Sequence, residues 1–100
     1  MRLMAKQTLL ERERLDGWLL SHAGWARDGE AAISRRFAFP DFSSALAFAV
    51  RVGLAAERHD HHPDVTIGWG YARVVWSTHD AGGVTELDLT LADICNNVGQ

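Results

Sequence analysis

Residues 31–58 read AAISRRFAFPDFSSALAFAVRVGLAAER and join a strand pattern directly to a helix pattern. Apolar and polar side chains alternate over residues 31–39, which is typical of a strand with one solvated face. Pro40 ends that strand, and Asp41 or Ser43 can cap a helix that runs to about the end of the quoted stretch. The apolar face of this helix is predicted to consist of Phe42, Leu46, Phe48, Ala49, Val52 and Leu54.

Two further elements are predicted upstream of this stretch. Residues 7–22 carry leucines and a tryptophan at helical spacing, with charged residues between them. Residues 24–27 form a short strand, and the turn signal Asp28-Gly29 pairs it with residues 31–39 as a β-hairpin.

Downstream, the pattern predicts a second hairpin and a last helix. Strands are expected at residues 64–67 and 71–78, with the Gly-Trp-Gly of residues 68–70 as the turn between them. Thr85 followed by Asp88 resembles a capping box with aspartate in place of glutamate, and it opens the last helix.

The predicted order α-β-β-α-β-β-α indicates an α+β fold, in which a four-stranded antiparallel sheet has three helices packed on one face. One domain is expected to cover residues 1–100, because a chain of this length is built around one hydrophobic core. The uncovered sheet face, or an edge strand, is available to a partner, so we expect a homo-oligomer.

Composition and charge argue against several classes of protein. The formal net charge of -3 disfavours a nucleic-acid-binding surface, which is normally basic. No apolar run approaches the roughly 18 residues needed to span a bilayer, and the first residues lack the apolar core of a signal peptide. The single cysteine, Cys95, cannot form an internal disulfide and is expected to be a buried structural thiol. We therefore expect a cytoplasmic protein that binds neither nucleic acid nor membrane.

Histidines and carboxylates are concentrated between Glu57 and Asp64, where the sequence reads ERHDHHPD. A further pair, His79-Asp80, follows the last predicted strand. Histidine is the side chain whose unperturbed pKa allows proton exchange near neutral pH, and it is also a common metal ligand. The cluster is therefore interpreted as a site for proton transfer or for a metal.

A metal site is the first of three interpretations. His59 and His61 have H-x-H spacing, which on a strand would place both rings on one face. With His79 and a carboxylate they could bind zinc. However, His59 is predicted to lie at a helix end, and no cysteine pair or helical H-x-x-x-H supports the site. These two points weaken the metal interpretation.

Acid/base catalysis is the second interpretation. A loop that turns at Pro63 can wrap His61 and His62 around a small ligand, while His79 approaches from the end of a strand. Three nearby carboxylates can set the tautomers of these histidines and raise their basicity: Glu57, Asp60 and Asp88. In the third interpretation the histidines are only surface residues or helix caps, as we expect for His22.

Taken together, these residues resemble the pattern of the pterin-4a-carbinolamine dehydratase family. That pattern has an acidic residue, a His-His-Pro, an aromatic, a His-Asp and a later Asp. It is matched here by Glu57, His61-His62-Pro63, Trp69, Thr78-His79-Asp80 and Asp88. The resemblance extends over roughly residues 8–98 and includes Gly24-Trp25.

The resemblance implies both a fold and a function. The implied fold is a four-stranded antiparallel sheet with three helices on one side. The implied activity is dehydration of 4a-hydroxytetrahydropterin to quinonoid dihydropterin, which recycles the pterin of aromatic amino-acid hydroxylases without a metal or organic cofactor. Family members form dimers or tetramers, so a homodimer or homotetramer is implied. Some animal members also bind a transcription factor, so a non-catalytic pterin- or protein-binding regulatory module is the alternative.

The resemblance also carries roles over to individual residues. The catalytic residues implied are His61, His62 and His79. The supporting or substrate-binding residues implied are Glu57, Asp60, Pro63, Asp88, Trp25, Thr78 and Asp80. We expect His61 and His79 to handle the leaving hydroxyl, and His62 to position or deprotonate the pterin ring. Trp69 and Trp76 are expected to be packing residues.

Overall fold

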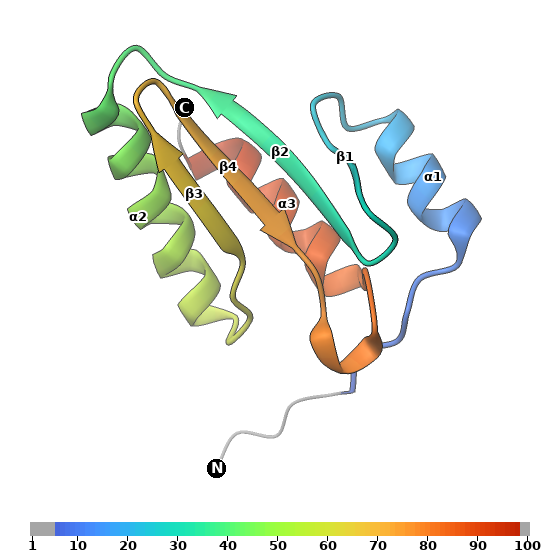
Figure 1. Ribbon diagram of the computed structural model, residues 1–100. Helices are drawn as coiled ribbons and strands as arrows, with labels where there is room; N and C mark the ends of the chain where they lie inside the picture. The colour runs from blue at the N-terminus through green and yellow to red at the C-terminus, as the bar shows by residue number, and fades with distance from the viewer. Residues whose placement is uncertain (1–5, 99–100) are drawn as a thin grey trace.

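The computed structural model describes residues 6–98, and its elements follow the predicted order α-β-β-α-β-β-α (Figure 1). The helices are α1 (Arg12–Leu20), α2 (Phe42–Arg58) and α3 (Glu86–Val98). The strands are β1 (Ala26–Asp28), β2 (Ala32–Ala38), β3 (Asp64–Gly68) and β4 (Tyr71–Trp76). A short 3-10 turn that was not predicted, η1 (His79–Ala81), lies between β4 and α3. The α+β class is confirmed.

The four strands form one antiparallel sheet in the order β1-β2-β4-β3. The two predicted hairpins are joined through β2 and β4, where Ile33 lies opposite Trp76 and Phe37 lies opposite Ala72. These side chains are buried, and they belong to one hydrophobic core between the helices and one face of the sheet. Figure 1 shows α3 behind the centre of the sheet, α2 beside β3 and α1 beside β1.

The first helix begins later than its leucine pattern predicts. Leu9 and Leu10 precede α1, and the backbone N–H of Leu10 donates to the carbonyl of Val84 at 2.9 Å. The side chains of Leu15 and Trp18 alone are buried along α1. The predicted start at residue 7 was therefore wrong, because leucines in an extended segment that packs on a loop were taken for helical ones.

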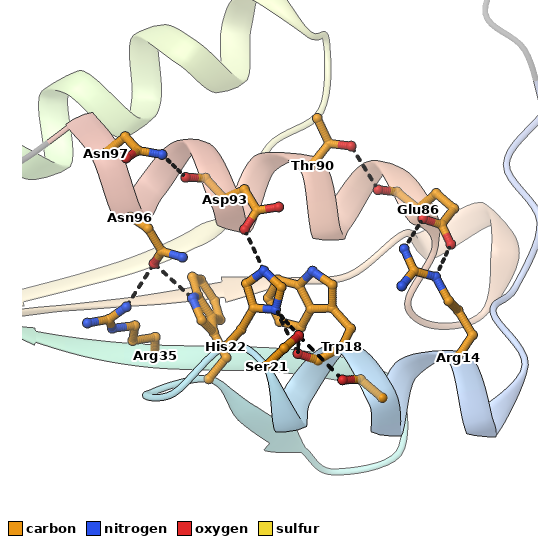
Figure 2. Close-up of polar contacts among 12 residues, drawn as sticks. Arg14, Trp18, Ser21, His22, Arg35, Glu86, Thr90, Asp93, Asn96 and Asn97 are labelled. Carbon is orange, nitrogen blue, oxygen red and sulfur yellow. Dashed lines mark hydrogen bonds and ion pairs between the residues drawn. The ribbon is translucent and has the colours of Figure 1, made fainter.

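Polar side chains connect α1 to α3 (Figure 2). Arg14 donates two hydrogen bonds to the carboxylate of Glu86, at 2.9 and 2.8 Å. Their mutual hydrogen bond raises the pKa of Arg14 and lowers the pKa of Glu86. His22 stacks on Trp18 with 3.9 Å between ring centroids, and its Nε2 lies 2.9 Å from a carboxylate oxygen of Asp93. His22 is thus a structural residue at the end of α1, as expected from its position.

The second helix starts and ends where the sequence predicts, but it buries a different face. The carboxylate of Asp41 accepts the backbone N–H of Ser44 at 2.8 Å, a bond that lowers the pKa of Asp41. The buried residues of α2 are Ala45, Phe48, Val52, Ala55 and Ala56. Small alanines thus face the sheet and α3, where a larger side chain would hold the helix away.

Three residues assigned to the apolar face of α2 instead lie on its outer side, so that part of the prediction was wrong. With one further residue they form a solvent-exposed row at four-residue spacing, called here the outer stripe: Phe42, Leu46, Val50 and Leu54, which are 46%, 44%, 53% and 59% exposed. Residues four positions apart lie on one face of a helix, so the outer stripe is continuous.

Cys95 is buried, as predicted, and its burial raises the pKa of the thiol to about 11.

No helix within residues 6–98 combines the length and the apolarity that crossing a bilayer requires.

Candidate active site

A pocket of about 230 Å³ lies between the loop after α2 and the loop after β4. Its lining brings together all three predicted catalytic histidines with four neighbours: Asp60, His61, His62, Ser77, Thr78, His79 and Asp80. A larger cavity of about 360 Å³ lies elsewhere, between the segment before α1 and the β1–β2 turn. Apolar side chains, two arginines and Glu30 line that cavity, but no histidine does, so the smaller pocket is the candidate site for the predicted histidine chemistry.

The first loop turns sharply to present its histidines. The helix α2 ends at Arg58, and the backbone N–H groups of both His59 and His61 donate to the carbonyl of Ala56 at 3.1 and 3.2 Å. Asp60 adopts a φ of 51°, a left-handed conformation that aspartate tolerates better than most residues. This turn directs His61 into the pocket before β3 begins.

The second loop is closed by a short backbone bridge. The strand β4 ends at Trp76, two residues earlier than predicted, and the N–H of Thr78 donates to the carbonyl of Gly83 at 2.9 Å. Between them the turn η1 holds His79 at an exposed position, and Gly82 closes the turn with a φ of 79°. A residue with a Cβ would be strained at that φ.

His61 is held by a buried carboxylate. Its Nε2 lies 2.6 Å from Oδ1 of Asp88, whose side chain is completely buried. The ring of His61 also lies nearly parallel to that of Trp76, with 5.8 Å between centroids. Because an ionised carboxylate can only accept a hydrogen bond, Nε2 carries the proton, and Nδ1 is left as the nitrogen that can exchange one with a ligand.

The second oxygen of Asp88 makes one of the two hydrogen bonds of the predicted capping box at the start of α3. Oδ2 accepts the backbone N–H of Thr85 at 2.9 Å, as the motif requires. It also accepts the hydroxyl of Thr78 at 2.8 Å. The hydroxyl of Thr85 lies 2.8 Å from the Thr78 hydroxyl. One aspartate therefore links the end of a helix to the wall of the pocket.

His62 and His79 lie in more open surroundings. Nε2 of His62 lies 2.6 Å from Oε1 of Glu57, but the two side chains are 58% and 75% exposed. Solvent screens such a pair, so it orients the ring only weakly. His79 is exposed, and its ring has no hydrogen-bond partner within residues 6–98. The three histidines thus range from a tightly held ring to an unrestrained one.

The other histidine of the cluster does not contribute to the pocket. Nδ1 of His59 lies 2.9 Å from the carbonyl oxygen of Ala55, so its ring turns back along α2 and caps the helix end. The H-x-H pair considered as a metal site is therefore not formed by His59 and His61. Within residues 6–98, histidine, cysteine and acidic side chains form no group of three placed to hold a metal ion.

None of the predicted aromatic residues within residues 6–98 lines the pocket. Trp25 is buried in the core, where its Nε1 donates to Oδ1 of Asn96 at 2.9 Å, and it does not line the pocket. Trp76 is buried, as predicted. Trp69 is 76% exposed in the β3–β4 turn, so its assignment as a packing residue was wrong. Gly70 beside it has a φ of 81°, and this turn projects the indole outward.

Two residues of the site were not identified from the sequence. Ser77 lines the pocket, and its hydroxyl donates to the carbonyl of Ala31 at 2.6 Å. Thr85 was interpreted only as part of a helix cap, although its hydroxyl joins the contacts around Asp88. The sequence signal that could have identified Thr85 as part of the site was its position three residues before Asp88. Pro63 lies next to the pocket in the chain but does not line it.

The fold and the pocket define an α+β protein with a histidine site supported by carboxylates, and known proteins are similar to it in sequence and fold. The family model described as pterin 4 alpha carbinolamine dehydratase matches residues 7–98. The chain belongs to the pterin-4a-carbinolamine dehydratase family.

Individual relatives match most of the chain. A protein of Rhizorhabdus wittichii, provisionally named pterin-4-alpha-carbinolamine dehydratase, is 45% identical over 91 residues, which cover 90% of this chain and 93% of the relative. A Bradyrhizobium protein with the same provisional name is 54% identical over 71 residues, which cover 70% of this chain and 71% of the relative.

Two solved structures share the fold. The transcriptional coactivator/pterin dehydratase from Brucella melitensis has a TM-score of 0.84 and 37% identity, with 91% of this chain and 98% of that chain covered. A pterin dehydratase-like RuBisCO assembly factor of the alpha-carboxysome has a TM-score of 0.65 and 21% identity, with 78% of this chain and 92% of that chain covered. At that identity the second likeness concerns the fold alone.

Proposed function

We propose that this protein dehydrates 4a-hydroxytetrahydropterin to quinonoid dihydropterin and water by histidine acid/base catalysis. The observation that carries the proposal is the convergence of His61, His62 and His79 on one pocket from two separate loops. In the reaction the C4a–O bond breaks as the hydroxyl takes up a proton and leaves as water, while a ring nitrogen loses a proton. The reaction includes no redox step, so side chains that exchange protons near neutral pH are sufficient.

The three histidine rings are held by their neighbours to different degrees, and this difference supports separate roles for them in the reaction. His61 and His79 deliver the proton to the leaving hydroxyl, with Nδ1 as the working nitrogen of His61. His62 positions the pterin ring or takes its proton. Each well-placed group of this kind contributes about 10²–10⁴-fold in rate. Asp60, Thr78 and Asp80 border the bound pterin in this scheme.

The test is a stopped-flow dehydration assay with freshly generated 4a-hydroxytetrahydropterin, run with and without a chelator. We expect acceleration that the chelator leaves unchanged, because no metal takes part. His61→Ala and His79→Ala are each expected to lower the rate strongly. His59→Ala is the matched control, since His59 belongs to the same loop but caps α2. Near wild-type rates for both His61→Ala and His79→Ala would show that the acid/base assignment is wrong.

We further propose that the protein forms a homodimer or homotetramer in the cytoplasm. The outer stripe of α2 is an apolar row on a surface helix, and such contiguous patches mark association sites. Asp41 precedes the start of α2, while Arg51 and Arg58 lie in its second half. Two copies of α2 packed antiparallel would therefore bring Asp41 of each copy toward Arg58 of the other. A dehydratase of this kind would serve an aromatic amino-acid hydroxylase, whose oxidised pterin it returns to the cycle.

A regulatory role is the second candidate function. The related structure from Brucella melitensis is described as both a transcriptional coactivator and a pterin dehydratase, which favours this alternative. In that case the outer stripe would bind a protein partner, and the pocket would bind pterin without turnover. Pterin binding by calorimetry together with no acceleration in the stopped-flow assay would support the regulatory module over the enzyme.

A further inference from the structure

Two buried threonine hydroxyls lie beneath the histidine pocket. The side chains of Thr78 and Thr85 are buried, with exposed fractions of 7% and 0%. Their Oγ1 atoms are 2.8 Å apart. Oδ2 of Asp88 lies 2.8 Å from the Thr78 hydroxyl and 3.4 Å from the Thr85 hydroxyl. These three side chains form one hydrogen-bonded group between β4 and α3.

The number of protons available sets the direction of these bonds. Each threonine hydroxyl donates one hydrogen bond, and an ionised carboxylate donates none. The short contact between Thr78 and Asp88 requires the Thr78 proton. The short contact between the two hydroxyls must then use the Thr85 proton. The bonds therefore run from Thr85 to Thr78 and from Thr78 to Oδ2 of Asp88.

The hydroxyl of Thr85 does not serve the role that its position suggests. A threonine before a helix ordinarily caps it by accepting a backbone N–H of the first turn. Within the described residues, the contacts of the Thr85 hydroxyl are instead to the side chains of Thr78 and Asp88. The hydroxyl is thus directed away from the helix backbone and toward the group that holds His61.

We propose that Thr85 is a positioning residue for His61. Its backbone N–H binds Oδ2 of Asp88 directly, at 2.9 Å, and its hydroxyl binds the same oxygen through Thr78. With Oδ2 held from two sides, Oδ1 faces the Nε2 of His61 at 2.6 Å. The ring of His61 is then held in one tautomer and one orientation. The catalytic consequence of this arrangement rests on the proposed function.

Without the Thr85 hydroxyl, Thr78 loses the donor that orients it, and the carboxylate of Asp88 gains freedom to rotate. The fraction of molecules with His61 correctly placed then falls. Substrate binding by pocket residues outside this hydrogen-bonded group, such as His62 and Asp80, does not depend on this orientation. The expected result is therefore a lower kcat with little change in KM.

The experiment compares Thr85→Val with Thr85→Ser. Valine keeps the shape without the hydroxyl, and serine keeps the hydroxyl. We expect Thr85→Val to lower kcat about 3- to 10-fold, the loss that corresponds to one buried hydrogen bond. Thr85→Ser should restore kcat to within about twofold, since it restores that bond. Glu86→Gln is the control, because it weakens the attachment of α3 to Arg14 at the neighbouring position without touching the hydroxyl group.

Proton NMR of the His61 Nε2–H supplies a readout that does not depend on activity. This proton, bonded to a carboxylate, is expected to give a downfield signal that is absent in His61→Ala. The signal should persist in Thr85→Ser and Glu86→Gln but shift or broaden in Thr85→Val. If Thr85→Val does not fold, Thr85→Ala replaces it in the same comparison.

The possible results distinguish a failure of the positioning role of Thr85 from a failure of the proposed dehydratase activity. An unchanged signal and kcat in Thr85→Val would overturn the positioning role, as would an equal loss in Glu86→Gln. If the wild-type protein shows no dehydration, the proposed function fails. The NMR comparison still decides whether Thr85 orients His61.

Discussion

Asp88 and His61 are 27 positions apart in the sequence, and their side chains meet at 2.6 Å between Oδ1 and Nε2. The carboxylate is completely buried, whereas the comparable pair of Glu57 and His62 is largely exposed. A charge in a buried position must be satisfied by specific partners, and its loss has larger effects than that of a screened surface charge. The two pairs therefore differ in how firmly they hold their histidines.

Asp88→Asn keeps the shape of the side chain and removes its charge. We expect the dehydration rate to fall about 10- to 100-fold, by analogy with carboxylates that orient metal-bound histidines. Stopped-flow kinetics would measure the change. Asp93→Asn is the matched control on the same helix, because Asp93 is an exposed carboxylate paired with the structural His22. A wild-type rate in Asp88→Asn would contradict the orienting role.

Trp76 and Trp69 offer a comparison between a buried and an exposed indole. Trp76 is 1% exposed and lies against the ring of His61, so Trp76→Ala should lower the free energy of unfolding by about 3–5 kcal/mol. Trp69 is 76% exposed, and Trp69→Ala should change that free energy by less than about 0.5 kcal/mol. Urea denaturation measures both. Equal effects would indicate that Trp69 packs against the protein in solution.

The buried thiol of Cys95 predicts a dependence of stability on alkaline pH. Burial raises the pKa of the thiol from 9.0 to about 11. Between these values the native protein keeps the proton that the unfolded chain releases, so the stability contribution is complete below pH 9 and is lost as pH rises toward 11. Denaturation across this range should show a steeper loss for the wild type than for Cys95→Ala. Parallel curves would contradict the burial of the thiol.

The outer stripe predicts that association depends on α2. Val50→Glu should convert the proposed homo-oligomer to smaller species, because a charge cannot be buried in an apolar contact without a partner. Size-exclusion chromatography with light scattering would measure the mass. Leu20→Glu is the control, since Leu20 is an apolar residue of α1 that is 90% exposed and lies outside the stripe. A wild-type mass in Val50→Glu would remove the stripe from the interface.

Most of the fold could be predicted because it follows from local patterns. The alternation of β2, the cap at Asp41 and the capping box at Asp88 each depend on residues a few positions apart. The prediction failed where the partner of a side chain is distant in sequence. Leu10 binds the loop at Val84 instead of starting a helix. The face of α2 was misassigned because apolar residues surround the helix, and only packing selects the alanines.

By itself, the sequence determined the order of the elements, the family and the three histidines that gather in one pocket. Tertiary structure alone decided how firmly each histidine is held. His61 lies in the loop after α2 and Asp88 lies in α3, so their contact depends on how α2 and α3 pack. The contribution of Thr85 to the site likewise depends on tertiary structure, because its hydroxyl contacts the hydroxyl of Thr78 on the other side of the η1 loop. Hydrogen bonds between distant segments depend on distances of a few tenths of an ångström, and local sequence patterns do not set those distances.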